Sequence, residues 1–280
     1  MEPTEANIGI AKKLEGAGGL VSNGKYNEAR TLLENTISKV EDSGNYDKGE
    51  CFEFAGPIEQ ILYIQKVGVK EAPKQAQEPV ASLYTTYGKL LLGLGESYKA
   101  RQAFELAKVY NPVSPSIMME YADTFRAEGD MDQFFKETLD IFQNVYASKE
   151  LARLYGNLGY YYIEKEKWTE AMGCYLMSLH YDNKNEDAKK EIAYIQKTAN
   201  GDAGVPSIDD FRKVADENNI PVGPNNDIVA MAAGYGHRAL SDGRKDVAHY
   251  FLSIVYDLTG DEELFNTLKD IEEEIAAEAK

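Results

Sequence analysis

Apolar residues recur along most of the chain at spacings of three, four and seven positions, which is the period of one face of an α-helix. Residues 81–114 show this pattern as two successive stripes separated by a short glycine-containing turn. The same order of positions returns in residues 152–185 and 229–262. The pattern predicts three helix–turn–helix units of about 34 residues each.

Small residues occupy one fixed place in each predicted unit. Gly88 precedes Ala100 by the same interval that separates Gly159 from Ala171 and Gly236 from Ala248. A larger side chain where two helices cross would push their axes apart. We therefore expect the Gly and the Ala of each pair to face each other where the two antiparallel helices come closest.

These residues resemble the tetratricopeptide repeat over most of the chain. The aromatic-x-Glu-Ala entries Tyr26-Asn27-Glu28-Ala29 and Trp168-Thr169-Glu170-Ala171 are typical of that family, and so is Pro112 after the second helix of its unit. The chain is also similar to bacterial tetratricopeptide proteins that have no assigned activity. The resemblance implies an all-α fold, a right-handed α-α superhelix of stacked helical hairpins, in which the first helices line a concave groove.

Weaker copies and composition breaks divide the chain further. Residues 10–43 and 115–148 keep part of the pattern, and single helices expected at 185–199 and 261–278 would cap two stacks with polar outer faces. Ser207 is expected to begin one more helix as its N-cap. The predicted organisation has four parts. An N-terminal degenerate repeat spans 1–67, and a Pro-containing exposed linker spans 68–79. Core repeats with a capping helix span 80–200, and a C-terminal repeat with an acidic capping helix spans 201–280.

Composition narrows the class of protein. The chain is 43% hydrophobic and 28% charged, as expected for a soluble globular protein, and it carries a net charge of −17. Such acidity argues against nucleic acid as a partner. No apolar run is long enough for a membrane span, and the N-terminus lacks a signal peptide pattern. The two cysteines lie far apart in the sequence. We therefore expect a reduced cytoplasmic protein without a membrane partner.

Charge is uneven along the chain. Residues 201–280 carry a net charge of −10. Two interpretations stay open: a solvated face that keeps the last helix soluble, or an acidic contact surface for a basic partner.

No motif for catalysis, a cofactor or a metal has the structural context or spacing that its chemistry requires. Gly234-Tyr235-Gly236-His237-Arg238-Ala239 matches a dinucleotide fingerprint as a string, but it lies inside a predicted helix without a preceding strand. The three histidines lack metal-ligand spacing, and the calcium-like string at 182–187 lacks the required Gly and Glu. Cys174 falls beside a buried stripe as a small hydrophobic residue. We expect no cofactor, no metal and no enzymatic activity.

The resemblance therefore implies a non-catalytic scaffold or adaptor for a protein or peptide. Its alternatives are a peptide-sensing regulator without its own output domain and an enzyme whose site the sequence does not reveal. The Lys-Asn carboxylate clamp of chaperone-tail binders is absent, since Thr85 and Lys89 stand at those positions. Lys89, Arg126 and Arg153 are cations expected in the groove. They favour an acidic partner segment, unless they pair with neighbouring acids. The residues expected to face the groove are Thr85, Lys89, Met119, Asp123, Arg126, Arg153, Asn157, Tyr160 and His237.

Overall fold

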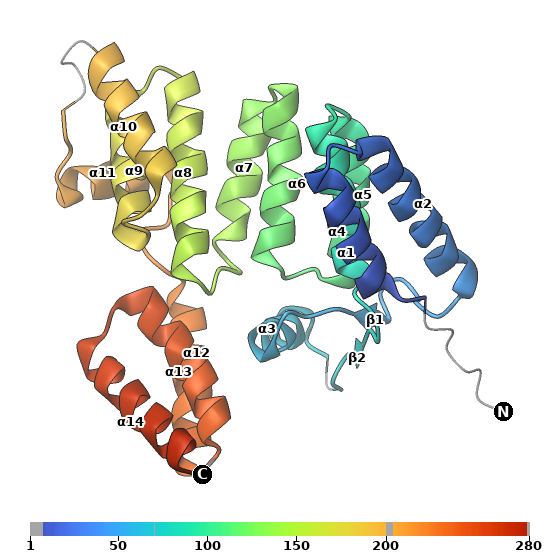
Figure 1. Ribbon diagram of the computed structural model, residues 1–280. Coiled ribbons are helices and arrows are strands. Elements are labelled where there is room, and N and C mark those ends of the chain that lie inside the picture. The colour runs from blue at the N-terminus through green and yellow to red at the C-terminus, as the bar shows by residue number, and fades with distance from the viewer. Residues whose placement is uncertain (1–7, 70, 200–203, 279–280) are drawn as a thin grey trace. The chain divides into compact units, whose positions relative to one another are not determined.

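The computed structural model describes residues 8–69, 71–199 and 204–278, and nearly all of its regular structure is helical (Figure 1). It forms two compact units, Met1–Phe134 and Phe135–Lys280. The boundary between them falls inside helix α7 (Met131–Ile141), within the degenerate repeat at 115–148. This division lies far from the linker at 68–79, which is part of the first unit.

The first unit is built on helical hairpins. Its helices are α1 (Ile10–Ser22), α2 (Tyr26–Ser43), α3 (Pro57–Val67), α4 (Val80–Gly93), α5 (Ser97–Tyr110) and α6 (Pro115–Glu128). Helices α1 and α2, and α4 and α5, pack as pairs, and α6 packs on both α4 and α5. Their apolar stripes meet in one core that includes Ala17, Leu33, Tyr84 and Ala107. The helical periodicity of the sequence predicts these hairpins correctly.

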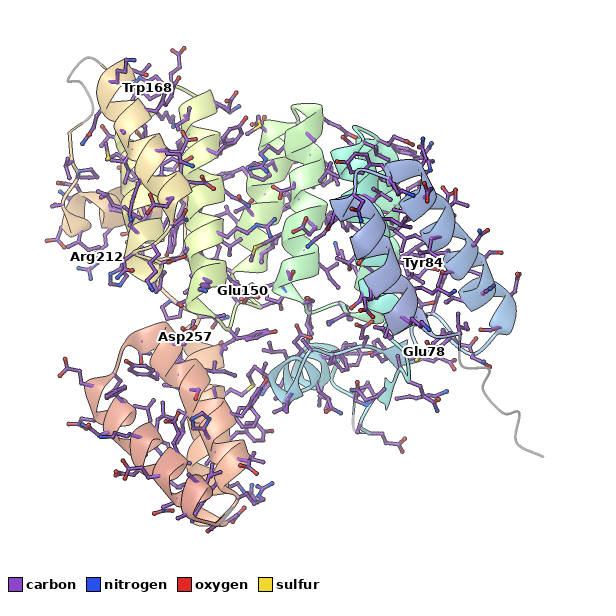
Figure 2. All side chains as sticks on the ribbon, in the orientation of Figure 1. Glu78, Tyr84, Glu150, Trp168, Arg212 and Asp257 are labelled. Atoms are coloured by element: carbon purple, nitrogen blue, oxygen red, sulfur yellow. The ribbon has the colours of Figure 1, made fainter. Side chains whose placement is uncertain are left out.

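The segment between α2 and α4 is attached to the helix ends by polar contacts. Strand β1 (Cys51–Phe52) pairs in parallel with strand β2 (Lys74–Gln75), so the linker at 68–79 contains a short extended pairing. Glu78, labelled in Figure 2, accepts hydrogen bonds from the amides of Ile8 and Ile10 at the start of α1. A carboxylate at a helix N-terminus satisfies amides that have no acceptor within the helix and interacts favourably with the helix dipole.

The second unit contains two helical groups. Helices α8 (Ser148–Glu164) and α9 (Trp168–Tyr181) form a hairpin, α10 (Glu186–Thr198) packs on α9, and α11 (Ile208–Asn218) also packs on α9. Helices α12 (Asn226–Ser241), α13 (Lys245–Thr259) and α14 (Glu262–Glu278) form the second group, in which α13 packs on both others. The expected capping helices α10 and α14 are both present, and Ser207 caps α11 within a capping box.

Two polar contacts connect the groups of the second unit. The hydroxyl of Tyr155 on α8 donates to the carbonyl of Pro221 at 2.8 Å and accepts from the amide of Gly223 at 2.8 Å. Asp257 on α13 accepts hydrogen bonds from the amide and the hydroxyl of Ser148, the first residue of α8, at 2.6 and 2.8 Å. The loop before α12 and the C-terminal end of α13 are therefore both attached to α8.

The contacts of the small residues correct the expected packing of Gly on Ala. A Cβ atom placed on Gly159 would lie 2.7 Å from the Tyr175 ring, and one on Gly88 would lie 2.6 Å from the Phe104 ring. A Cβ on Gly236 would likewise lie 2.6 Å from the Leu252 side chain. The glycine thus accommodates the large residue one turn after the expected alanine. Ala100, Ala171 and Ala248 are fully buried nonetheless, as the repeat pattern predicts.

Candidate functional site

A polar cleft of about 230 Å³ opens on one face of the first unit. Helix α4 presents residues three, four and seven positions apart to it, so that they share one helix face. The start of α6 forms another part of the wall, and the segment between β1 and α3 forms a third. The lining residues are Glu53, Ala55, Ala81, Ser82, Thr85, Thr86, Lys89, Asn111, Ser114, Ser116 and Ile117.

Hydrogen bonds from several elements hold the cleft together. Glu53 accepts from the amide of Ser82 at 3.0 Å and from its hydroxyl, at the first turn of α4. Asn111, which follows α5, donates its side-chain amide to the Glu53 carbonyl at 2.7 Å and to Glu59 Oε2 at 2.8 Å. Burial raises the pKa of the Glu53 carboxyl above its usual value, and the hydrogen bonds from Ser82 and Ala81 oppose this shift. These contacts join segments that are distant in sequence.

The structure places two of the expected groove residues, Thr85 and Lys89, in this cleft. Lys89 Nζ lies 3.4 Å from Glu120 Oε1, and Arg126 lies 3.1 Å from Asp123 Oδ1. Both cations thus pair with acids of α6, which is the alternative to an acidic partner that the sequence leaves open. In both pairs the carboxylate is largely buried and the cation is more exposed.

Two residues expected in the groove are buried. Met119 is 1% exposed and belongs to the core, so it offers no surface to a partner, and we remove it from the candidates. Asp123 is 8% exposed, with its carboxylate directed at Arg126. Both stand on α6, where the face that packs on the neighbouring helices is wider than the repeat pattern indicates.

The remaining candidates lie in the second unit. Arg153, Asn157 and Tyr160 are three and four positions apart on α8, and therefore share a face of this helix. Asn157 is 6% exposed, and its Nδ2 has no hydrogen-bond partner among the residues that the structure describes. His237 is exposed on α12. The α8 residues form one group, and His237 stands on a different helix.

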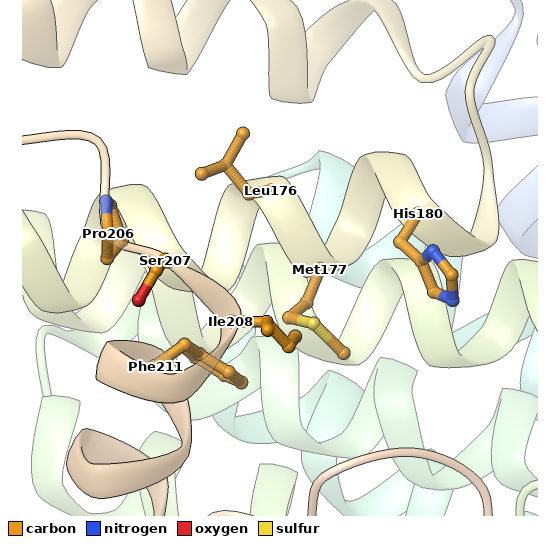
Figure 3. A pocket seen from close by; sticks show the side chains of 8 residues that line it. Leu176, Met177, His180, Pro206, Ser207, Ile208 and Phe211 are labelled. Carbon is orange, nitrogen blue, oxygen red and sulfur yellow. The ribbon is translucent and has the colours of Figure 1, made fainter.

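A second hollow, of about 260 Å³, lies between α9 and α11 (Figure 3). Its lining is mostly apolar and includes Leu176, Met177 and Ile208, with His180 and Ser207 as polar members. Phe211 of α11 packs against Gly173 of α9, where a Cβ would lie 2.6 Å from the ring. Gly173, on a helix otherwise rich in large residues, is the sequence signal for this contact. It lies outside the repeat template, so the spacing of the repeats does not reveal it.

The described residues contain no group of three His, Cys, Asp or Glu side chains arranged to hold a metal ion. Cys51 and Cys174 are both buried, and burial raises the pKa of the Cys174 thiol far above its usual value. The buried Cys174 agrees with its interpretation as a small hydrophobic residue. Within the same described residues, no helix has the length and apolar character needed to cross a membrane.

Comparison with known proteins yields structural neighbours only. No family model matches the chain, and no curated protein matches it. Solved structures similar to it include PilF of Pseudomonas aeruginosa, at 12% identity and a TM-score of 0.48 over 93% of this chain and 96% of that one. A tetratricopeptide repeat protein from Parabacteroides merdae shows 12% identity and a TM-score of 0.41, with 93% and 97% of the two chains covered.

A third neighbour is the C-terminal part of a TPR repeat-containing protein from Cytophaga hutchinsonii, at 13% identity and a TM-score of 0.38 over 91% and 99% of the two chains. All three TM-scores lie below 0.5, so the assignment of the fold rests on the helical hairpins of this chain. Those hairpins define an all-α repeat protein. Their repeat length and their small residues at the helix crossings resemble those of the tetratricopeptide repeat.

Proposed function

We propose that the protein is a non-catalytic scaffold that binds a protein or peptide segment along its first-helix faces. The observation that carries this proposal is the cleft between α4 and α6. Most of its lining residues carry hydroxyl, amide or charged side chains, whereas apolar residues fill the hairpin cores. Polar side chains held by a rigid helical framework suit hydrogen bonding to an extended peptide.

The α8 face supports the same function in the second unit. Asn157 has a buried amide nitrogen without a described partner, and a peptide carbonyl is the kind of group that would accept from it. Tyr160 is half-buried on the same face and offers a rigid ring with little entropy to lose on binding.

Site-specific photo-crosslinking tests this proposal directly. A photoreactive phenylalanine analogue at Thr86, in the cleft, is compared with the same analogue at Gln102, which is exposed on the second helix α5. We expect covalent adducts with partner proteins in native cells from the Thr86 position and few or none from Gln102. Adducts that form chiefly at Gln102, or at neither position, would contradict binding on the first-helix face.

A further inference from the structure

Three side chains of the α4–α6 cleft, those of Ser82, Thr85 and Asn111, direct their protons into the protein. The Ser82 hydroxyl donates to Glu53, and the Thr85 hydroxyl donates to the Ala81 carbonyl at 2.7 Å. The Asn111 side-chain nitrogen donates to the Glu53 carbonyl and to Glu59. A hydroxyl has one proton and two lone pairs, and a side-chain amide oxygen has two lone pairs. The groups left available in this part of the cleft are therefore acceptors.

Asn111 shows this most clearly. Its side chain lines the cleft and is 3% exposed, and its Oδ1 has no hydrogen-bond partner among the described residues. The two contacts of its nitrogen fix the orientation of the amide, since a flipped amide would place oxygen against oxygen at both Glu53 and Glu59. A buried acceptor without a donor costs free energy, which a ligand that supplies an N–H group would recover.

Charge at the cleft selects the kind of donor. Glu53 lines the cleft with its carboxylate held at Ser82, while the positive charge of Lys89 is balanced by Glu120. The whole chain carries a net charge of −17, so its field attracts cations. The Glu53 carboxylate beside these acceptors favours a cationic N–H donor over a carboxylate or a phosphate.

We propose that this cleft binds the cationic side chain, lysine or arginine, of a basic partner segment. The ammonium or guanidinium group donates to Asn111 Oδ1 and Thr85 Oγ1 beside the Glu53 carboxylate. The amides of Ser116 and Ile117 in the first turn of α6 have no acceptor within the helix, so they suit a main-chain carbonyl of the same segment. This inference rests on the proposed scaffold function and reverses the partner charge that the groove cations of the sequence favour.

Short peptides that differ in one residue test the proposal on the full chain. The probes are capped hexapeptides of alanine and glycine with a central lysine, arginine, norleucine or glutamate, titrated by calorimetry and followed through the NMR signal of the Asn111 side-chain amide. We expect the lysine or the arginine peptide, or both, to shift this signal and to bind at least about tenfold more tightly than norleucine, the loss expected for one charge-assisted hydrogen bond. Comparing lysine with arginine shows which cation the cleft prefers.

Matched variants identify the acceptors. Thr85→Val keeps the shape of the side chain and removes its oxygen, and Glu53→Gln removes the negative charge. Each substitution is expected to weaken binding of the cationic peptide by about fivefold to tenfold. Thr31→Val is the control, because the Thr31 hydroxyl makes the same intrahelical bond on α2 outside the cleft, to the Asn27 carbonyl at 3.0 Å. Circular dichroism verifies that all three variants fold.

The possible failures are distinguishable. Equal binding of the norleucine and cationic peptides, tighter binding of the glutamate peptide, or unchanged lysine affinity in both cleft variants would overturn the cation proposal. If such peptides still shift signals of α4, α6 or α8, the scaffold function stands. If no peptide of any charge binds, and the Thr86 crosslinker yields no adduct, the scaffold function falls together with the cation site.

Discussion

The backbone of Gly159 lies directly against the ring of Tyr175, so closely that a Cβ on Gly159 would be 2.7 Å from its Cε2 atom. Tyr175 is 4% exposed and cannot swing away into solvent. The same relationship joins Gly88 to Phe104 and Gly236 to Leu252. In each of these three hairpins a large side chain of the second helix packs on the bare backbone of the first.

Gly159→Ala is expected to destabilise the protein by about 1–2 kcal/mol, because overpacking a tight core contact outweighs the better helix propensity of alanine. Gly156→Ala in the same helix is the matched control. There the nearest atom, Ser178 Oγ, would be 3.9 Å from the new Cβ, so we expect a gain of about 0.4–1 kcal/mol. Urea unfolding of both variants measures the difference. Equal shifts for the two would show that the Tyr175 ring is not in tight contact with α8.

This contact shows how far the sequence predicts the fold. The spacing of Gly159 and Ala171 correctly identifies the hairpin and the buried helix faces. Spacing alone gives the wrong partner, because helical side chains lean toward the N-terminus of their helix. The Tyr175 ring therefore reaches back toward the level of Ala171 and covers Gly159.

The cleft was less predictable for a different physical reason. Thr85 and Lys89 follow from the repeat template, but Glu53 and Asn111 belong to segments without helical periodicity. Their positions depend on hydrogen bonds between residues far apart in sequence, such as Asn111 to Glu59. The hollow between α9 and α11 likewise depends on how α11 folds back on α9 after a break in the pattern.

The pH dependence of stability should report the burial of Glu53. Its pKa is raised in the folded state, chiefly by desolvation, so the folded protein holds this proton more tightly than the unfolded chain does. The contribution of this group to the free energy of unfolding is therefore largest when it is protonated. It falls as pH rises from the unfolded value of 4.5 toward the higher folded value, and then stays constant.

Glu53→Gln removes this decrease of the unfolding free energy with rising pH, while it keeps an acceptor for the Ser82 amide. The difference in unfolding free energy, variant minus wild type, should therefore increase between about pH 4 and about pH 7 in urea titrations. Glu50→Gln, an exposed carboxyl in the same segment, serves as the control and should show a smaller change. A difference for Glu53→Gln that decreases over this range would mean that hydrogen bonds, not burial, dominate its pKa.

The linker at 68–79 should be cut by a protease before the helices are. Glu71 and Ala72 are exposed outside regular structure, whereas Lys74 and Gln75 are held in β2, with the Ala76 amide bonded to the Phe52 carbonyl at 2.6 Å. A protease specific for glutamate is expected to cut first after Glu71, because cleavage needs a locally extended chain. Mass spectrometry identifies the first fragment. Initial cleavage after a helical residue such as Glu105 would contradict the exposure of this segment.

Asp257 supplies from a distant helix the cap that the start of α8 lacks. The N-cap residue of α8 is Ala147, whose side chain cannot accept a hydrogen bond, and Asp257 of α13 accepts from the amide and hydroxyl of Ser148 instead (Figure 2). Its charge also favours this end of the helix dipole. Asp257→Ala should therefore destabilise the second unit by about 0.5–2 kcal/mol, the usual cost of losing an N-cap. Asp257→Asn, which keeps an acceptor oxygen, should lose less.

Faster amide exchange confined to the start of α8 would distinguish the loss of this cap from a general change of surface charge. Hydrogen exchange of the Ser148–Leu151 amides should accelerate in Asp257→Ala, because the first turn of α8 frays when the Ser148 amide loses its acceptor. Asp270→Ala removes an exposed acid from α14 and should leave these amides unchanged. If Asp257→Ala and Asp270→Ala exchange alike at the start of α8, then α13 does not cap this helix. In that case Tyr155, through Pro221 and Gly223, would be the polar contact that holds the loop before α12 on α8.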